Sequence, residues 1–261
     1  MLKEKYVNLI NYLKNLGSVA VAFSGGVDST LLLKVCSDVL KENVLAIMVI
    51  APYTPKWEVE EAKALLKEFG VKYKFLEVEM IEEIRFSPRE RCYICKNAIF
   101  TKIKEEARAH GIHNVLDGTN LDDTKDYRPG LRALKELNII SPLLANGITK
   151  SDIRNLSKEL KLQTWDKPAY ACLLSRIPYG QEVIEAELER IERAEVYLMG
   201  LGFSGVRVRS HGDLARIELP KKYFPKILNE KILEEILMKL KEFGFKYVTL
   251  DLEGYKMGSL N

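Results

Sequence analysis

A glycine turn between an apolar strand and a helix is the first feature of this sequence that could do chemistry. The run from Val19 to Phe23 is short, apolar and β-branched at alternate positions, which predicts a buried strand. It breaks at Ser24-Gly25-Gly26, and apolar residues recur at helical spacing from Asp28 to Leu40. Such a turn gathers unpaired backbone N–H groups at the positive end of a helix dipole. The stretch therefore predicts an anion site, with phosphate as its usual ligand.

The order of residues in this turn indicates which class of phosphate-binding enzyme the sequence resembles. It matches neither Gly-x-x-x-x-Gly-Lys-Ser/Thr nor Gly-x-Gly-x-x-Gly. Ser24-Gly25-Gly26-Val27-Asp28-Ser29 instead resembles the PP-loop of the ATP pyrophosphatases, which split ATP between the α and β phosphates. Ser24 and Ser29 can donate hydroxyl hydrogen bonds to phosphate oxygens, and Asp28 can hold Mg²⁺ against them. We therefore assign ATP and Mg²⁺ binding to this loop, in preference to an ordinary glycine turn followed by an Asp cap.

Three of the four cysteines form a second candidate site. Cys92 and Cys95 are spaced as Cys-x-x-Cys, and Cys172 lies in an aperiodic segment, 165–180. The pair alone suits zinc, a redox couple or coincidence. Three thiolates without an obvious fourth ligand suit a [4Fe–4S] cluster with one open iron, although an unrelated Cys172 is a comparable explanation. Cys36 lies among leucines and valines and is predicted to be a core residue.

An acidic segment, 120–130, directly follows a predicted strand at 115–119. Asp122 and Asp123 within it could bind metal or orient a substrate, and a solvated connection is an equally good interpretation. Both this segment and the glycine turn follow strands, where ligands bind in parallel sheets.

Alternating strands and helices must position these groups. We expect strands at 19–23, 44–50, 71–78, 115–119 and 139–143, separated by helices, after a leading helix at 1–16. This alternation predicts an α/β fold with a mostly parallel sheet. We place this PP-loop ATP-binding domain at 1–180.

The remainder, 181–261, is predicted to be a smaller α+β domain. Helices at 182–201 and 231–243 accompany strands at 206–209, 214–219 and 247–252, with His211 in a hairpin turn. This domain is our candidate for substrate phosphate binding and for assembly into a homo-oligomer.

Composition limits the class of protein. The 261 residues are 47% hydrophobic and 30% charged, as in soluble globular proteins. No apolar run approaches the ~20 residues that span a membrane. The N-terminus is amphipathic and unlike a signal peptide, so we expect a cytoplasmic protein. The net charge of +3 does not indicate a nucleic-acid partner.

Further motifs give a resemblance that covers nearly the whole chain. They are Arg91-Cys92-Tyr93-Ile94-Cys95-Lys96, Asp122-Asp123 with Asp126-Tyr127-Arg128-Pro129-Gly130, Ala171-Cys172-Leu173-Leu174-Ser175-Arg176-Ile177-Pro178-Tyr179-Gly180, and Val206-Arg207-Val208-Arg209 with His211-Gly212-Asp213. With the PP-loop, they make the chain similar to the LarE family of ATP-dependent sulfur transferases, which build the nickel-pincer nucleotide cofactor of lactate racemase.

The resemblance implies a reaction and roles for residues. The family adenylylates a carboxylate of pyridinium biscarboxylic acid mononucleotide and then replaces AMP with sulfur. In one form a single cysteine gives up its own sulfur; in the other, three cysteines hold a [4Fe–4S] cluster that carries sulfide from a donor. Cys92, Cys95 and Cys172 match the cluster form. The resemblance also assigns Arg176, Arg207 and Arg209 to the substrate phosphate, although two arginines on a strand would otherwise be taken for a solvated face.

The sequence leaves three alternative functions open. A tRNA thiolase also pairs a PP-loop with cysteines, but would need a basic surface or an RNA-binding extension. An ammonia-using synthetase shares the loop without needing three cysteines. An ATP-binding protein with a structural zinc is the alternative that is not an enzyme.

Overall fold

The computed structural model describes residues 2–125, 129–168 and 171–256, and its contacts divide the chain into two units. The first consists of Met1–Ala51, Lys56–Glu79 and Glu90–Lys167. The second consists of Pro52–Pro55, Met80–Arg89 and Pro168–Asn261. The second unit is thus built from three stretches of chain, and it includes the segment 168–180 that the sequence assigned to the first domain.

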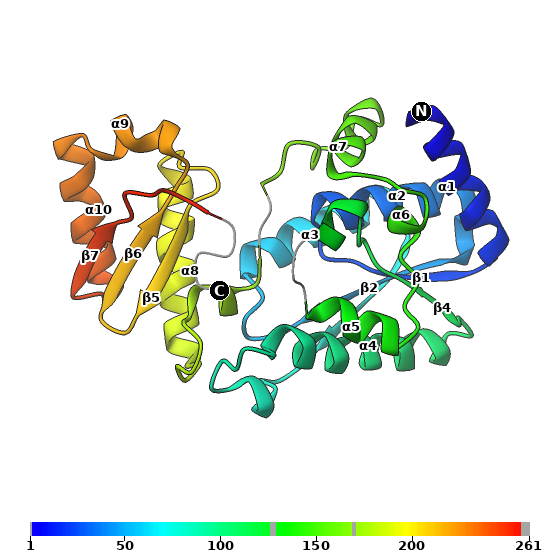
Figure 1. The fold of residues 1–261 in the computed structure, drawn as a ribbon, viewed down its shortest axis with the longest axis horizontal. Coiled ribbons are helices and arrows are strands. Elements are labelled where there is room, and N and C mark those ends of the chain that lie inside the picture. Colours follow the sequence, from blue (N-terminus) through cyan, green and yellow to red (C-terminus); the bar gives the residue numbers. More distant parts are fainter. Residues whose placement is uncertain (1, 126–128, 169–170, 257–261) are drawn as a thin grey trace. The chain divides into compact units, whose positions relative to one another are not determined.

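A four-stranded parallel sheet in the order β3-β2-β1-β4 is the centre of the first unit (Figure 1). Its strands are β1 (Val19–Ala22), β2 (Val44–Ile50), β3 (Lys72–Glu77) and β4 (Asn114–Leu116). The predicted parallel α/β sheet is confirmed. The expected strand at 139–143 is wrong: Ile140 makes one isolated bridge with Leu116, and Pro142 opens a helix because proline cannot donate to a strand ladder.

Helices cover both faces of this sheet (Figure 1). They are α1 (Leu2–Leu16), α2 (Val27–Leu40), α3 (Lys56–Phe69), α4 (Arg91–Ala109), α5 (Gly130–Glu136), α6 (Pro142–Ala145) and α7 (Lys150–Glu159), with short 3₁₀ turns η1 (Lys41–Asn43) and η3 (Leu121–Lys125). Among the described residues, no helix of the chain has both the length and the apolar content to cross a membrane.

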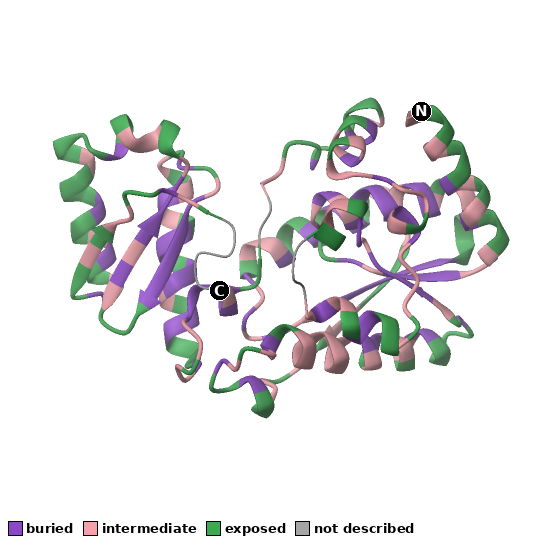
Figure 2. Ribbon diagram, viewed as in Figure 1, coloured by how far each residue is buried: buried purple, intermediate pink, exposed green. Residues whose placement is uncertain are grey.

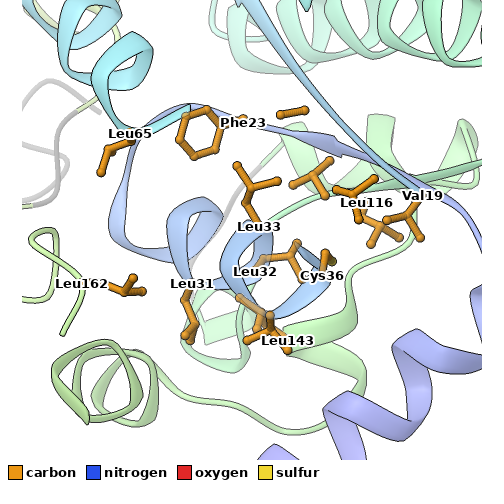
Figure 3. Packing of buried hydrophobic residues seen from close by; sticks show 14 of the residues in the cluster. Val19, Phe23, Leu31, Leu32, Leu33, Cys36, Leu65, Leu116, Leu143 and Leu162 are labelled. Carbon is orange, nitrogen blue, oxygen red and sulfur yellow. The ribbon is translucent and has the colours of Figure 1, made fainter. Parts of the chain in front are cut away.

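Two apolar cores lie on opposite faces of the sheet, because alternate strand residues point in opposite directions. Val19 and Val21 join one core with buried side chains of α1, α2, α3, α6 and α7 (Figure 3). Ala20 joins the other core with side chains of α4 and α5. The continuous burial of β1 and the first part of β2 (Figure 2) reflects this cover on both sides.

The second unit holds a three-stranded sheet in the order β5-β6-β7, antiparallel between the first two strands and parallel between the last two. Its strands are β5 (Arg207–His211), β6 (Leu214–Glu218) and β7 (Tyr247–Leu250). Its helices are α8 (Glu185–Gly200), α9 (Phe224–Ile227) and α10 (Glu230–Glu242), with 3₁₀ turns η2 (Glu82–Ile84), η4 (Leu173–Arg176) and η5 (Lys221–Tyr223). This is the small mixed α+β architecture that the sequence predicted.

The core directly behind the glycine turn gives a stability prediction. Leu32 on α2 is 0% exposed, so the Leu32→Ala variant should lower the free energy of unfolding by about 2–5 kcal/mol. Val7→Ala, on a 52% exposed side chain of α1, is the control and should change it by about 0.5 kcal/mol or less. Urea denaturation followed by tryptophan fluorescence reports on this unit, because Trp57 and Trp165 both belong to it. Equal effects of the two changes would contradict the packing described here.

Candidate functional site

The glycine turn joins β1 to α2, and hydrogen bonds of Ser24 and Ser29 hold its backbone together. The Ser29 hydroxyl donates to the Gly26 carbonyl at 3.2 Å and accepts from the Ser24 backbone N–H at 3.3 Å. The hydroxyl oxygens of Ser24 and Ser29 are 3.1 Å apart, and Gly26 N–H donates to Ser24 Oγ at 3.4 Å. The backbone therefore curls at the N-terminus of a fourteen-residue helix, the arrangement that binds phosphate.

Two glycines allow this turn to pack closely against its neighbours. Gly25 has φ +68°, and a Cβ there would lie 3.2 Å from Ala62 Cβ on α3. A Cβ at Gly118, after β4, would lie 3.1 Å from both Asp28 Cβ and the Ser29 nitrogen. The turn is thus held between α3 and the loop that follows β4.

Asp28 lies at the centre of a charged cluster. Lys150 Nζ is 2.5 Å from its Oδ2, and Asn120 Nδ2 donates to its Oδ1 at 3.4 Å. Burial raises the pKa of the Asp28 carboxyl above its ordinary value, Lys150 opposes that rise, and Asp123 adds to it. A partly desolvated carboxylate with a second acidic residue nearby is a donor set that suits Mg²⁺.

The structure separates Asp122 from Asp123, which the sequence could not. Asp123 Oδ2 accepts from the backbone and side-chain N–H groups of Asn120, at 3.0 and 2.9 Å, and Asn120 also contacts Asp28. Asp122 instead accepts from the backbone N–H of Lys150 at 2.8 Å and from Lys125 Nζ at 2.7 Å. Asp123 therefore belongs to the Asp28 side of the site, whereas Asp122 fixes the start of α7.

Lys150 is a site residue that sequence reasoning missed. It opens α7 immediately after Thr149, whose side chain forms a capping box with Asp152. A lysine in the first turn opposes the helix dipole, so its position was a usable signal. Its ammonium group balances the negative charge of Asp28 at the carboxyl edge of the sheet.

Cys92 and Cys95 lie one turn apart at the start of α4, so both belong to one side of the helix. Cys92 is exposed and Cys95 half-buried, and none of the four cysteines forms a disulfide. A Cβ at Gly130 would lie 2.7 Å from Lys96 Cδ and 3.5 Å from the Cys92 carbonyl oxygen. Gly130, at the end of the acidic segment, therefore packs against the first turns of α4, which carry Cys92 and Cys95. Asp126, Tyr127 and Arg128 of this segment lie outside the described residues.

Cys36 is 0% exposed, as predicted for a core residue. Burial strongly raises the pKa of its thiol, which keeps the thiol protonated and unreactive.

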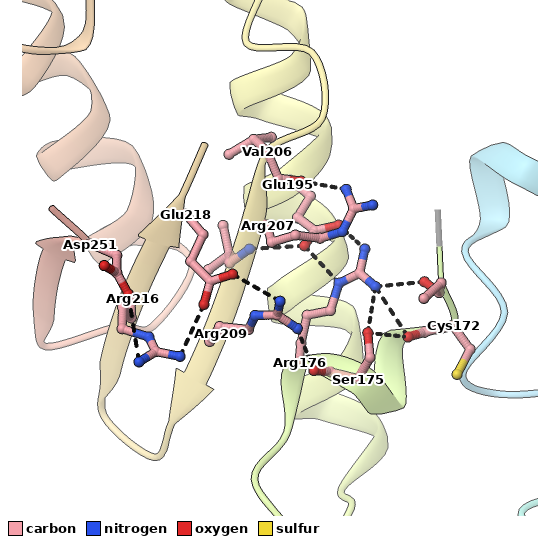
Figure 4. Close-up of polar contacts among 12 residues, drawn as sticks. Cys172, Ser175, Arg176, Glu195, Val206, Arg207, Arg209, Arg216, Glu218 and Asp251 are labelled. Carbon is pink, nitrogen blue, oxygen red and sulfur yellow. Dashed lines mark hydrogen bonds and ion pairs between the residues drawn. The ribbon is translucent and has the colours of Figure 1, made fainter. Parts of the chain in front are cut away.

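In the second unit, Arg176 holds the turn that carries Cys172 (Figure 4). Its guanidinium donates to the carbonyls of Ala171 and Cys172, at 2.6 and 3.2 Å, and pairs with Glu195 on α8 at 2.8 and 2.9 Å. Burial alone would raise the pKa of Glu195, but Arg176 and then Arg207 bring it below the ordinary value. Cys172 itself is exposed, and Figure 4 shows its sulfur turned away from the arginines.

Arg207 and Arg209 lie two apart on β5 and are buried, not solvated. Arg209 pairs with Glu218 at 2.8 Å and donates to the Ser175 carbonyl at 2.5 Å. Glu218 also accepts from Arg216, which lies 3.7 Å from Asp251 (Figure 4). The predicted substrate-binding arginines thus belong to two ion-pair groups within the second unit, one around Glu195 and one around Glu218, which both contact Ser175.

The donor sets fit the implied groups to different degrees. Asp28 and Asp123 provide the carboxylates that Mg²⁺ needs. For a [4Fe–4S] cluster, three reduced cysteines are available, two in the first unit and Cys172 in the second. Among the residues that the structure describes, no group of three His, Cys, Asp or Glu side chains is assembled for a metal.

Comparisons with known proteins show the family to which the chain belongs. The NAD synthase family matches residues 2–112, which include the glycine turn. A pyridinium-3,5-bisthiocarboxylic acid mononucleotide synthase of Lactiplantibacillus plantarum is 37% identical over 100% of this chain and 95% of its own length. Uncharacterized proteins of Synechocystis sp. and Methanocaldococcus jannaschii are 43% and 36% identical, over 100% and 98% of this chain and 98% and 94% of their own lengths.

The parallel sheet, the serine–glycine loop and the half-buried Asp28 define an enzyme of the PP-loop ATP pyrophosphatase class, which uses ATP with Mg²⁺. Within this class, the chain belongs to the LarE family of pyridinium-3,5-bisthiocarboxylic acid mononucleotide synthases. It is therefore an ATP-dependent sulfurtransferase.

The pairing of Lys150 with Asp28 predicts how the rate of pyrophosphate release depends on pH. A carboxylate that holds Mg²⁺ has to be ionised, so if Asp28 has this role, activity should fall as the pH drops through its pKa. Lys150→Met removes a group that lowers this pKa, and the acidic limb of pyrophosphate release should move to higher pH. Lys125→Met, which removes an exposed partner of Asp122, is the control and should leave the limb in place. An unshifted limb for Lys150→Met would refute the assignment.

Proposed function

We propose that this protein adenylylates a carboxylate of pyridinium biscarboxylic acid mononucleotide and converts it to a thiocarboxylate. The single observation that carries the proposal is the full-length similarity to a pyridinium-3,5-bisthiocarboxylic acid mononucleotide synthase. The product is a precursor of the nickel-pincer nucleotide. We propose further that the sulfur comes from sulfide on a [4Fe–4S] cluster held by Cys92, Cys95 and Cys172.

Activation of the carboxylate is the task of the PP-loop. Hydroxide is a very poor leaving group, so the substrate carboxylate attacks the α-phosphorus of ATP, forming an acyl-adenylate and breaking the bond to pyrophosphate. The backbone of Ser24, Gly25 and Gly26 and the hydroxyl of Ser29 would hold the phosphates. Asp28 would hold Mg²⁺, which neutralises charge as pyrophosphate leaves.

Sulfur then replaces AMP at the acyl carbon. A bound cluster would supply the sulfide, which forms the C–S bond as the C–O bond to AMP breaks. The chain's own contribution is to place Cys172, and Arg176 does so through the carbonyls of Ala171 and Cys172. An exposed sulfur on a turn fixed by hydrogen bonds is accessible to a cluster that would bind there.

Buried arginines of the second unit could bind the anionic substrate. Arg176, Arg207, Arg209 and Arg216 lie near the carboxylates of Glu195, Glu218 and Asp251 (Figure 4). Within the described part of the chain, the Nε–H groups of Arg209 and Arg216 are buried without an acceptor. These features support our proposal that Arg176, Arg207 and Arg209 bind the substrate phosphate.

The first prediction from this mechanism concerns Asp28. Asp28→Asn keeps the size of the side chain but removes its charge, so pyrophosphate release should fall by about two orders of magnitude or more. Release is measured with the pyridinium substrate, ATP and Mg²⁺. Asp38→Asn, in an exposed pair with Lys34 on the same helix, is the matched control and should retain the rate. Unchanged release by Asp28→Asn would remove Asp28 from the metal site.

The second prediction concerns the three cysteines. Each of the single variants Cys92→Ala, Cys95→Ala and Cys172→Ala should cost the anaerobically purified protein its visible iron–sulfur absorbance and thiocarboxylate formation, while pyrophosphate release continues. Iron and acid-labile sulfide are counted in parallel. Cys36→Ala, in the core, should keep both. Full sulfur transfer by Cys92→Ala would favour the form in which Cys172 gives up its own sulfur.

A further inference from the structure

Lys167 contacts the glycine turn directly, and the mechanism above gives it no role. Its Nζ donates to the Gly25 carbonyl at 3.1 Å and pairs with Glu61 on α3 at 2.7 Å. The ammonium also lies 5.5 Å from the centroid of the Trp57 ring. Only 14% of the side chain is exposed, which is low for a lysine.

The backbone of Lys167 is held as well as its side chain. Arg154 on α7 donates to the carbonyls of Trp165 and Lys167, each at 2.8 Å. The same helix begins with Lys150, which pairs with Asp28. Helix α7 thus connects to the nucleotide loop at two places: through Lys150 to Asp28, and through Arg154 and Lys167 to Gly25.

Lys167 is also the last residue of the first unit. Cys172 follows five residues later, and an extended chain covers at most ~3.6 Å per residue, or ~18 Å in all. In any arrangement of the two units, the Cα of Cys172 stays within that distance of the Cα of Lys167. The contact with Gly25 therefore holds, at the predicted phosphate site, the residue from which the chain runs to Cys172.

We propose that Lys167 is a positioning residue that couples adenylate formation to sulfur transfer. Its bond to Gly25 anchors the start of the Cys172 segment to the loop that holds the nucleotide. Without that anchor, the acyl-adenylate still forms, but it meets the sulfide at the Cys172 site less often and is hydrolysed by water instead. This inference rests on the proposed function and adds a residue that acts between its two steps.

The test compares two products of the same reaction, thiocarboxylate formed and pyrophosphate released. For Lys167→Met, which keeps the length of the side chain, the ratio of thiocarboxylate to pyrophosphate should fall about tenfold, while pyrophosphate release stays within about threefold of wild type. Lys167→Arg can still donate to both acceptors and should restore much of the ratio. Lys63→Met, which breaks an exposed pair with Glu60 on α3, should leave the ratio unchanged.

A merely structural role would lower both products together and leave the ratio as it was, which would overturn the inference. An unchanged ratio with normal rates in Lys167→Met would also overturn it. Failure of the proposed function is distinguishable, because the wild-type protein would then form no thiocarboxylate at all.

Discussion

The charged contact between α7 and the first turn of α2 is the constraint on which the nucleotide site depends. Asp28 is buried enough for desolvation to oppose its charge, and Lys150 is the group that chiefly compensates. The pair spans the carboxyl edge of the sheet, so it forms only when strands, helices and the loop after β4 are all in place. Burial and Lys150 therefore act in opposite directions on the pKa of the Asp28 carboxyl.

The second unit also contains buried carboxylates, and there arginines balance their charge. Glu195 and Glu218 are almost completely buried and each is balanced by arginine, so removing either partner would leave an uncompensated charge. The same guanidinium groups also bind the backbone around Cys172 and Ser175. Buried arginines therefore both balance the glutamates and hold the backbone of the turn that carries Cys172.

Local patterns in the sequence predicted most of this fold, because helix periodicity, strand length and the glycine turn are short-range signals. The extra strand at 139–143 was wrong because Ile139 and Ile140 have strand character, but the following proline starts α6. Lys150 and Lys167 were missed because their partners lie 122 and 142 residues away, and no local pattern identifies such a partner. The unusual position of Lys150 in the first turn of α7 was the one local signal. The burial of Arg207 and Arg209 was also hidden, since their glutamate partners come from other elements.

The order in which the chain visits its two units affects how the protein emerges from the ribosome. Tyr53 and Arg85 are made early, yet the backbone groups that bond to them, on Leu173 and Val183, are synthesised about a hundred residues later. The segments Pro52–Pro55 and Met80–Arg89 therefore complete these contacts only after the strands of the parallel sheet have been synthesised. A cut at any single peptide bond therefore yields no pair of fragments that corresponds to the two units.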